Sequence, residues 1–167
     1  SAFDSAGQRC SAARVLFLQD DIAPRVLEML KGATELLTVG DPLDYATDVG
    51  PVIDETSQDA LDAHKMRLAR TAKLVAETTL SPACRAGTFV APAIFEIDRM
   101  GVLEREVFGP VLHVVRFDSG RLDAVIDQIN ATGFGWTLGI HSRIAAVAER
   151  VAERARVGNI YVNRNQI

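Results

Sequence analysis

The fold of this chain is decided by a β-branched run that reads Gly-Pro-Val-Leu-His-Val-Val over residues 109–115. Valine and isoleucine favour the pleated, half-buried surface of a sheet. The apolar residues here are nearly continuous rather than alternating, which is typical of a strand covered on both faces. We therefore expect a buried strand at 111–115, preceded by Gly109 and Pro110.

Strand-like and helix-like segments alternate on both sides of this run. Short apolar stretches predict further strands, and residues recurring at helical spacing along one stripe, as at Leu61, His64, Leu68 and Ala72, predict helices. Expected strands cover 13–18, 88–97, 111–115, 136–141 and 159–163, and expected helices begin near Pro24 and cover 57–77, 122–129 and 144–157. The alternation predicts a three-layer αβα architecture with a largely parallel sheet. No repeat or long linker divides the chain, so we expect one domain over residues 1–167.

The composition is that of an ordinary soluble globular protein, with 48% hydrophobic and 24% charged residues. The net charge of −4 leaves no basic footprint for nucleic acid. No apolar run approaches the ~20 residues of a membrane span, and the start lacks the features of a secretory signal. Two cysteines and three histidines show no zinc spacing. We expect reduced thiols, no metal and a cytoplasmic location.

The segment with the clearest chemical potential is Gly-Gln-Arg-Cys-Ser over residues 7–11. A thiol between a glycine-containing turn and a buried strand can lie at the rim of an α/β sheet, where such folds place their sites. The neighbouring Arg9 favours the thiolate, which is the nucleophilic form of Cys10. The alternative is a small buried side chain, the commoner state of a free thiol, and composition alone favours it.

Weaker signals come from three other segments. In Glu-Val-Phe-Gly-Pro over 106–110, a carboxylate in a turn can accept hydrogen bonds from two sugar hydroxyls, and Phe108 can lie against a flat ring. The alternative is a solvated Glu106 and a core phenylalanine. Cys84 lies in a predicted polar loop without supporting residues, so we expect it to be structural, as we expect of the histidines. The glycine-rich stretch 130–135 lacks phosphate-binding spacing and predicts a helix end and a turn.

In their order and separation, the cysteine segment and the Glu-x-Phe-Gly-Pro segment resemble those of the aldehyde dehydrogenase superfamily. Stretches at 109–117, 130–143 and 158–165 closely resemble one branch, the pyrroline-5-carboxylate dehydrogenase part of the bifunctional bacterial proline utilization A proteins. The resemblance covers the whole chain. It implies the catalytic-cysteine domain of that fold, and an NAD-dependent oxidation of glutamate semialdehyde to glutamate in proline catabolism.

The same resemblance implies a role for each site residue. Cys10 is expected to attack the aldehyde carbon, with its own backbone N–H in the oxyanion hole, and to form a thioester that water hydrolyses. Glu106 is expected to bind the ribose beside the nicotinamide of NAD, with Phe108 packed near that end of the cofactor. Arg9 and Ser11 flank the nucleophile and are expected to touch the aldehyde substrate.

Much of the family's machinery is expected outside this sequence, which starts without Met and stops directly after an expected strand. By resemblance, other parts of the protein hold the NAD-binding domain, the glutamate that activates water and the asparagine of the oxyanion hole. The loop that grips the substrate carboxylate and the dimerisation segment are also expected there. We therefore expect a fragment that folds without turning over. Its parent is expected to be a homo-oligomer, and an FAD-dependent proline dehydrogenase domain can accompany it.

Three alternatives stand beside this interpretation. The substrate can be a different semialdehyde, because the loop that would select it lies outside the sequence. The chain can be a catalytically silent structural module, although such a module is expected to have lost its nucleophile. A thiol-based redox or peroxide sensor is the third alternative, but Cys84 is not an evident resolving partner for Cys10.

Overall fold

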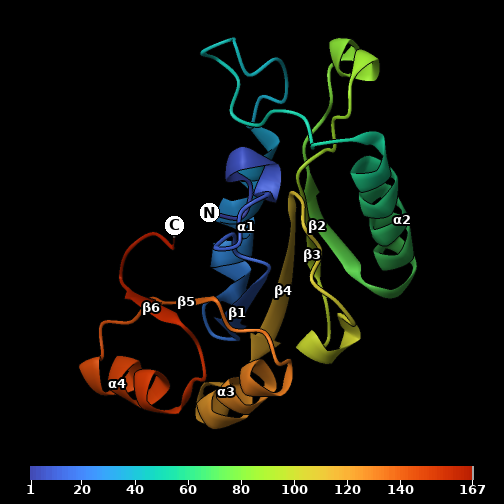
Figure 1. Ribbon diagram of the computed structural model, residues 1–167. Coiled ribbons are helices and arrows are strands. Elements are labelled where there is room, and N and C mark those ends of the chain that lie inside the picture. The colour runs from blue at the N-terminus through green and yellow to red at the C-terminus, as the bar shows by residue number, and fades with distance from the viewer. Residues whose placement is uncertain (167) are drawn as a thin grey trace.

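The computed structural model describes residues 1–166, which form an α/β structure around a four-stranded sheet (Figure 1). The strands lie in the order β1 (Val15–Gln19), β4 (Val111–Phe117), β3 (Ala93–Glu96) and β2 (Lys73–Glu77). The β1–β4 and β4–β3 pairs are parallel, and β2 runs antiparallel to β3. The predicted largely parallel sheet is thus confirmed, and the β-branched run lies in β4, which has a neighbour on each side.

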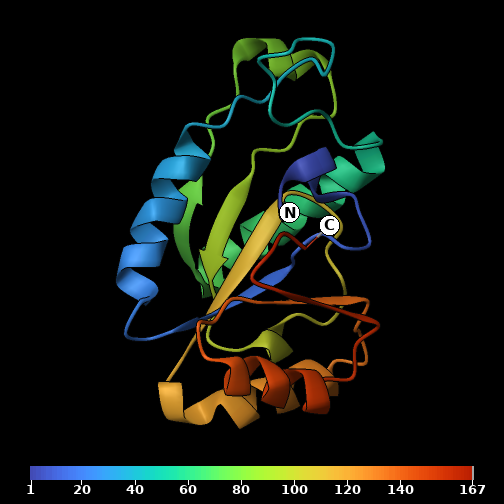
Figure 2. The same ribbon diagram turned by 90° about the vertical axis from the view of Figure 1, so that its left-hand side faces the viewer.

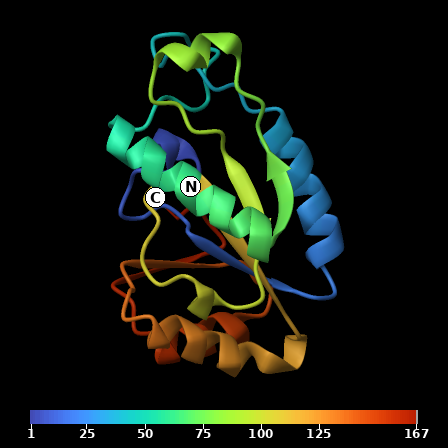
Figure 3. The ribbon, with the colours of Figure 1, turned by 90° about the vertical axis from the view of Figure 1, so that its right-hand side faces the viewer.

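Helices α1 (Ala23–Glu35) and α2 (Glu55–Thr71) cover opposite faces of this sheet, as Figure 1 and the side view in Figure 3 show. Successive residues of a strand point to opposite faces, so β4 contributes to two cores. Leu112 and Val114 join the core beneath α1, whereas Val111 and Val115 join the core beneath α2. This alternation of buried side chains produces the predicted three layers, and it explains why β4 is apolar throughout.

A smaller unit follows β4 and lies below the main sheet in Figure 2. It consists of α3 (Leu122–Ala131), β5 (Thr137–Ile140), α4 (Ala145–Arg154) and β6 (Asn159–Val162). Strands β5 and β6 pair in parallel as a separate two-stranded sheet. A core of Ile126, Ile140 and Val151 joins the helices to this sheet. No helix within residues 1–166 combines the length and apolar character that a membrane crossing requires.

The expected helix over 57–77 is wrong in its last third. Helix α2 ends at Thr71, Ala72 is extended with φ −136° and ψ 168°, and Lys73–Glu77 is the edge strand β2. Of the four residues in the stripe that predicted the helix, Leu61, His64 and Leu68 are buried within α2, whereas the fourth, Ala72, lies just beyond its end. Residues 73–77 instead pair with β3. This pairing joins two segments that are distant in the chain, so helical spacing does not reveal it. The expected strand over 88–97 is shorter, because β3 begins only after Pro92.

Four short 3-10 helices complete the described chain. They are η1 (Asp4–Gly7), η2 (Pro82–Ala86), η3 (Met100–Val102) and η4 (Ser119–Arg121). Two of them position the cysteines: Cys10 follows η1, and Cys84 lies within η2.

Candidate active site

The two segments singled out in the sequence meet at one edge of the main sheet. Cys10 lies in the turn before β1, and residues 106–110 lead directly into β4. Because β1 and β4 are parallel neighbours, the segments that precede them reach the same edge. This is the edge at the amino ends of these strands, whereas sites in parallel α/β sheets usually lie at the carboxyl ends. The rim position expected of Cys10 is therefore found, but on the opposite edge from the usual one.

The cysteine turn begins with an unusual backbone. Ser5, Ala6 and Gly7 have φ of +54°, +52° and +67°. These values lie in the left-handed region, which residues other than glycine adopt only at a cost in free energy. At Gly7 the conformation coincides with a close approach, since a Cβ there would lie 2.1 Å from the carbonyl oxygen of Gly109. The cysteine turn thus rests backbone against backbone on the Glu-x-Phe-Gly-Pro segment.

Side chains hold this turn in place. Gln8 accepts a hydrogen bond from the backbone N–H of Ile53 at 2.9 Å and donates one to the carbonyl of Ser5 at 3.1 Å. Arg9 Nε donates to Ser5 Oγ at 3.0 Å. Arg9 therefore bonds back to η1, so in this structure its side chain contributes to the shape of the turn.

Cys10 itself is exposed, so the alternative of a small buried side chain is wrong for this residue. Within residues 1–166 the backbone N–H groups of Cys10 and Ser11 donate no hydrogen bond, and none involves Cys10 Sγ. The turn therefore presents a thiol together with two unused N–H donors. Free donors next to a nucleophile are the elements from which an oxyanion hole is built.

Cys84 differs from Cys10 in every one of these respects. Its side chain is 5% exposed and belongs to the core beneath α2. Its thiol donates to the carbonyl of Val39 at 3.4 Å and lies 3.5 Å from Ser81 Oγ. The structural role expected of Cys84 agrees with this burial. The predicted polar loop is wrong, because the segment folds into η2 and turns the thiol inward.

Glu106 and Phe108 lie beside the cysteine turn and share a neighbour, Arg14. Glu106 Oε1 accepts from Arg14 Nε at 3.0 Å, and the second oxygen, Oε2, has no hydrogen bond within residues 1–166. The Phe108 ring is 46% exposed, and Arg14 Cζ lies 4.4 Å from its centroid. The alternative of a core phenylalanine is therefore wrong. An open carboxylate oxygen and a half-exposed ring fit a ribose hydroxyl and a flat heterocycle, the groups at the nicotinamide end of NAD.

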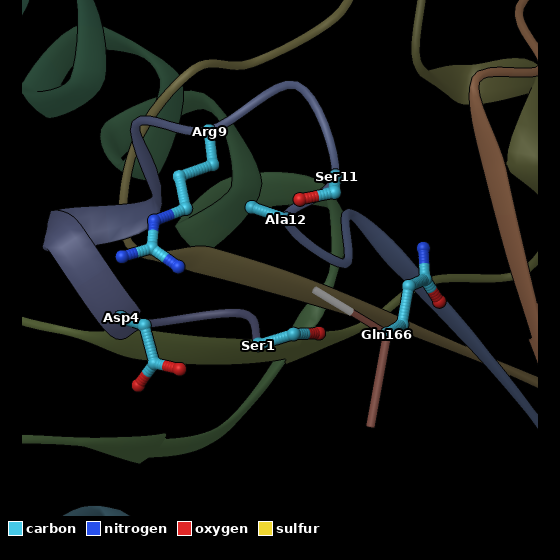
Figure 4. A pocket seen from close by; sticks show the side chains of 6 residues that line it. All are labelled: Ser1, Asp4, Arg9, Ser11, Ala12 and Gln166. Atoms are coloured by element: carbon cyan, nitrogen blue, oxygen red, sulfur yellow. The ribbon is translucent and has the colours of Figure 1, made fainter. Parts of the chain in front are cut away.

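Arg9 and Ser11 flank Cys10 in the chain. Both line a shallow depression, together with Ser1, Asp4, Ala12 and Gln166 (Figure 4). Figure 4 shows the Arg9 side chain extending toward η1 and away from Ser11. The structure thus brings Cys10, Glu106 and Phe108 to one edge, while Arg9 and Ser11 open onto the neighbouring surface.

Arg14 contacts both segments, although no role was predicted for it. Its guanidinium donates to Gly7 O at 2.5 Å and to Arg9 O at 2.9 Å, in addition to its bond with Glu106. A signal was present, since Arg14 is a charged residue inside the apolar run 13–18 that predicts a buried strand. A long cation in such a run requires a polar partner.

A buried histidine pair lies behind Arg14. His113 Nδ1 bonds the Arg14 carbonyl at 2.8 Å, and His113 Nε2 lies 2.8 Å from His64 Nε2. Arg67 Nη2 lies 2.8 Å from His64 Nδ1. A carbonyl can only accept a hydrogen bond and a guanidinium can only donate one. The Arg14 carbonyl at one end of the pair and the Arg67 guanidinium at the other therefore fix the tautomers of the two histidines. His113 carries its proton on Nδ1 and His64 carries its proton on Nε2, with both rings neutral.

The surroundings keep this pair neutral. Burial is the largest cause that lowers the pKa of His64 to about 4, followed by the charges of His113, Arg67 and Arg105. Burial likewise lowers the pKa of His113, although its hydrogen bond to the Arg14 carbonyl acts in the opposite sense. Within residues 1–166, no cluster of three or more His, Cys, Asp or Glu side chains is arranged to hold a metal ion.

Comparisons with known proteins identify the class. Residues 1–167 match the model of the aldehyde dehydrogenase family, so the chain belongs to that family. The resemblance based on the segments 7–11 and 106–110 is confirmed.

Particular relatives are more similar still. The chain is 46% identical to the bifunctional protein PutA of Escherichia coli K12 over 172 residues, which cover 100% of the chain and 13% of that protein. A solved structure of Bradyrhizobium japonicum proline utilization A shares 52% identity with a TM-score of 0.95, over 100% of this chain and 17% of the other. Betaine aldehyde dehydrogenase of Agrobacterium fabrum is 34% identical over 96% of this chain and 33% of its own length. The chain therefore spans a small part of each relative.

Proposed function

We propose that this chain is the catalytic-cysteine domain of an NAD-dependent aldehyde dehydrogenase that oxidises glutamate semialdehyde, the open form of pyrroline-5-carboxylate, to glutamate. The observation that carries the proposal is the exposed Cys10 turn, which rests on the segment bearing Glu106 and Phe108. The likeness to proteins named for proline utilization supports this substrate and a role in proline catabolism.

Cys10 is the nucleophile of the proposed reaction. Its thiolate forms a C–S bond to the aldehyde carbon, and the π electrons of the carbonyl move onto the oxygen. The unused N–H of Cys10 is available to hold that oxyanion. NAD, when bound, supplies the acceptor for the hydride that this carbon releases, which leaves a thioester. Water then adds to the thioester carbon and the C–S bond breaks, which releases the carboxylic acid and restores the thiol.

Glu106 and Phe108 are proposed to hold the nicotinamide end of the cofactor. The free Oε2 of Glu106 is available to accept a hydrogen bond from a ribose hydroxyl. The exposed side of the Phe108 ring offers an apolar surface to the adjoining heterocycle. Arg9 and Ser11 are proposed substrate contacts, because they line the surface beside Cys10.

Other parts of the reaction are assigned to segments that this chain does not contain. The base that activates water is proposed to come from elsewhere in the parent, as the resemblance to the family implies. The NAD-binding domain, the loop for the substrate carboxylate and the oligomerisation segment belong to the same proposal. We expect the isolated chain to be inactive, and the parent to be a cytoplasmic homo-oligomer, with FAD in any accompanying proline dehydrogenase domain.

A second candidate is a dehydrogenase for another aldehyde. The 34% identity with betaine aldehyde dehydrogenase supports it, since a thiolate attacks the carbonyl carbon in the same way whichever aldehyde carries it. A silent structural module is disfavoured, because the exposed Cys10 thiol belongs to none of the cores of the described residues.

The test is NAD reduction by the full-length protein that carries this chain, with pyrroline-5-carboxylate and, in parallel, betaine aldehyde. Removal of the nucleophile in Cys10→Ala is expected to lower kcat by roughly 10⁴-fold or more. Cys84→Ala is the matched control and is expected to retain activity, since that thiol is buried in the core. Activity that survives Cys10→Ala would refute the mechanism, and a preference for betaine aldehyde would refute the substrate.

A further inference from the structure

Arg14 joins the two candidate segments by contacts to both of them. Its side chain is 15% exposed, and three of its N–H groups donate to three acceptors on two segments: Gly7 O, Arg9 O and Glu106 Oε1. Its guanidinium also covers one side of the Phe108 ring. One planar group therefore touches the backbone on the amino side of Cys10, the candidate ribose-binding carboxylate and the candidate cofactor-packing ring.

The backbone of Arg14 is held as firmly as its side chain. Its carbonyl accepts two hydrogen bonds from His113, one from the backbone N–H at 3.0 Å and one from Nδ1 at 2.8 Å. His113 is fully buried in β4, and it rests on His64 of α2. Arg14 is therefore anchored to the centre of the sheet, and its guanidinium extends from this anchor to the two loops.

The contacts require a guanidinium in particular. Its donors form a rigid planar fork, so one group can reach a carboxylate in one direction and two carbonyls in another. A lysine at this position is a single point charge on a flexible stem and would leave some of these acceptors without a partner. Gly7 O, at the end of the left-handed turn of residues 5–7, is one of the acceptors that the guanidinium reaches.

We propose that Arg14 is a positioning residue, which sets the place of the Cys10 turn relative to Glu106 and so aligns the nucleophile with the nicotinamide end of the cofactor. This inference rests on the proposed function for the roles of Cys10 and Glu106. Alignment of reacting groups governs the rate strongly, since a displacement of about 1 Å can cost a hundredfold. An ion pair with a purely structural role would affect the stability of the fold and leave the coupling between the two segments untouched.

The experiment compares Arg14→Lys with Arg116→Lys in the full-length protein. Arg116 is a matched control, since its Nε bonds Asp20 at 2.8 Å outside the candidate site. Arg14→Lys is expected to lower both kcat and the affinity for NAD, measured by titration calorimetry, by roughly tenfold or more. Arg116→Lys is expected to leave both within about twofold, as is usual for an exposed pair. A folded Arg14→Lys protein with unchanged NAD affinity and kcat would overturn the proposal.

A second variant keeps the test decisive if Arg14→Lys fails to fold. Glu106→Gln removes the negative charge that pairs with Arg14, at an exposed position in the segment 106–110. Hydrogen–deuterium exchange then measures the effect on the amides of the Cys10 turn. The hydrogen-bonded amides of Gln8 and Ala12 are expected to exchange at least about tenfold faster, because the guanidinium is held less firmly. Exchange of these amides at the wild-type rate would overturn the proposal. This readout needs no cofactor, so it remains informative if the full-length protein oxidises no aldehyde and the proposed function fails.

Discussion

The two cysteines of this chain lie in similar local structures and in opposite environments. Each is associated with a short 3-10 helix, η1 for Cys10 and η2 for Cys84. Cys10 is exposed, and the backbone before it is left-handed, whereas Cys84 is buried, and η2 has ordinary geometry. The chain therefore offers two thiols of equal intrinsic chemistry, and only their surroundings distinguish a candidate nucleophile from a core residue.

The surroundings differ in kind as well as in exposure. The Cys10 turn is held by polar groups, among them Gln8, Arg14 and, behind Arg14, the histidine pair. Cys84 packs among valines and other apolar side chains of the core beneath α2. The hydrophobic effect has no preferred direction, whereas each hydrogen bond requires a donor and an acceptor in a defined geometry. The exposed thiol therefore depends on the more directional set of contacts.

The largest expected difference between the regions is in thiol reactivity. Iodoacetamide is expected to alkylate Cys10 of the native protein about a thousandfold faster than Cys84, because a buried thiol reacts only through rare opening of the fold. Mass spectrometry of the two cysteine peptides over time measures both rates. In denaturant the rates are expected to converge. Comparable rates in the native protein would show that burial does not separate the two thiols.

Replacing a glycine near each cysteine by alanine is expected to change the free energy of unfolding by different amounts. Gly7→Ala adds a Cβ 2.1 Å from Gly109 O at a φ of +67°, so it is expected to destabilise the fold by roughly 4 kcal/mol and to reduce activity strongly. At Gly87, beside η2, the nearest neighbour of an added Cβ is a side chain, the Phe89 ring at 2.7 Å, and φ is not left-handed, so Gly87→Ala is expected to cost less than Gly7→Ala, about 2 kcal/mol or less. Urea unfolding measures both values. Equal costs would contradict the close backbone contact at Gly7.

A smaller effect is expected from acid. His64 has a lowered pKa in the folded chain, about 4, against an ordinary value of 6.5, so the unfolded chain binds its proton first as pH falls. Stability should therefore be complete above about pH 6.5 and decline down to about pH 4, by on the order of 3 kcal/mol from His64 alone. His113, with its pKa also lowered, acts in the same direction.

Urea unfolding at several pH values measures this loss. In His64→Gln the decline between pH 6.5 and 4 should become shallower, because one titrating group of the pair is gone. The exposed His141→Gln is the control and should leave the decline unchanged. If both variants follow the wild-type curve, the histidine pair is not the source of acid sensitivity beneath the Cys10 turn.

Local pattern predicted much of the fold. The β-branched run in β4, the helical spacing of Leu61, His64 and Leu68, and the alternation of segments led to an αβα structure with a largely parallel sheet, as found. These features depend on residues that are neighbours in the chain, so they can be predicted without knowledge of tertiary contacts. The end of α2 was missed for the converse reason, since β2 exists through its pairing with β3.

The family, the segments 7–11 and 106–110 and the residue types of the candidate chemistry all follow from the amino-acid sequence. The folded structure is needed to learn which cysteine is exposed, that Gly7 rests on Gly109, and that Arg14 and the histidine pair support the site. Exposure and hydrogen bonding depend on which groups lie nearby in space, and these groups come from distant parts of the chain. Parallel pairing of β1 with β4 brings together loops that are far apart in the chain. Neither composition nor periodicity predicts this contact.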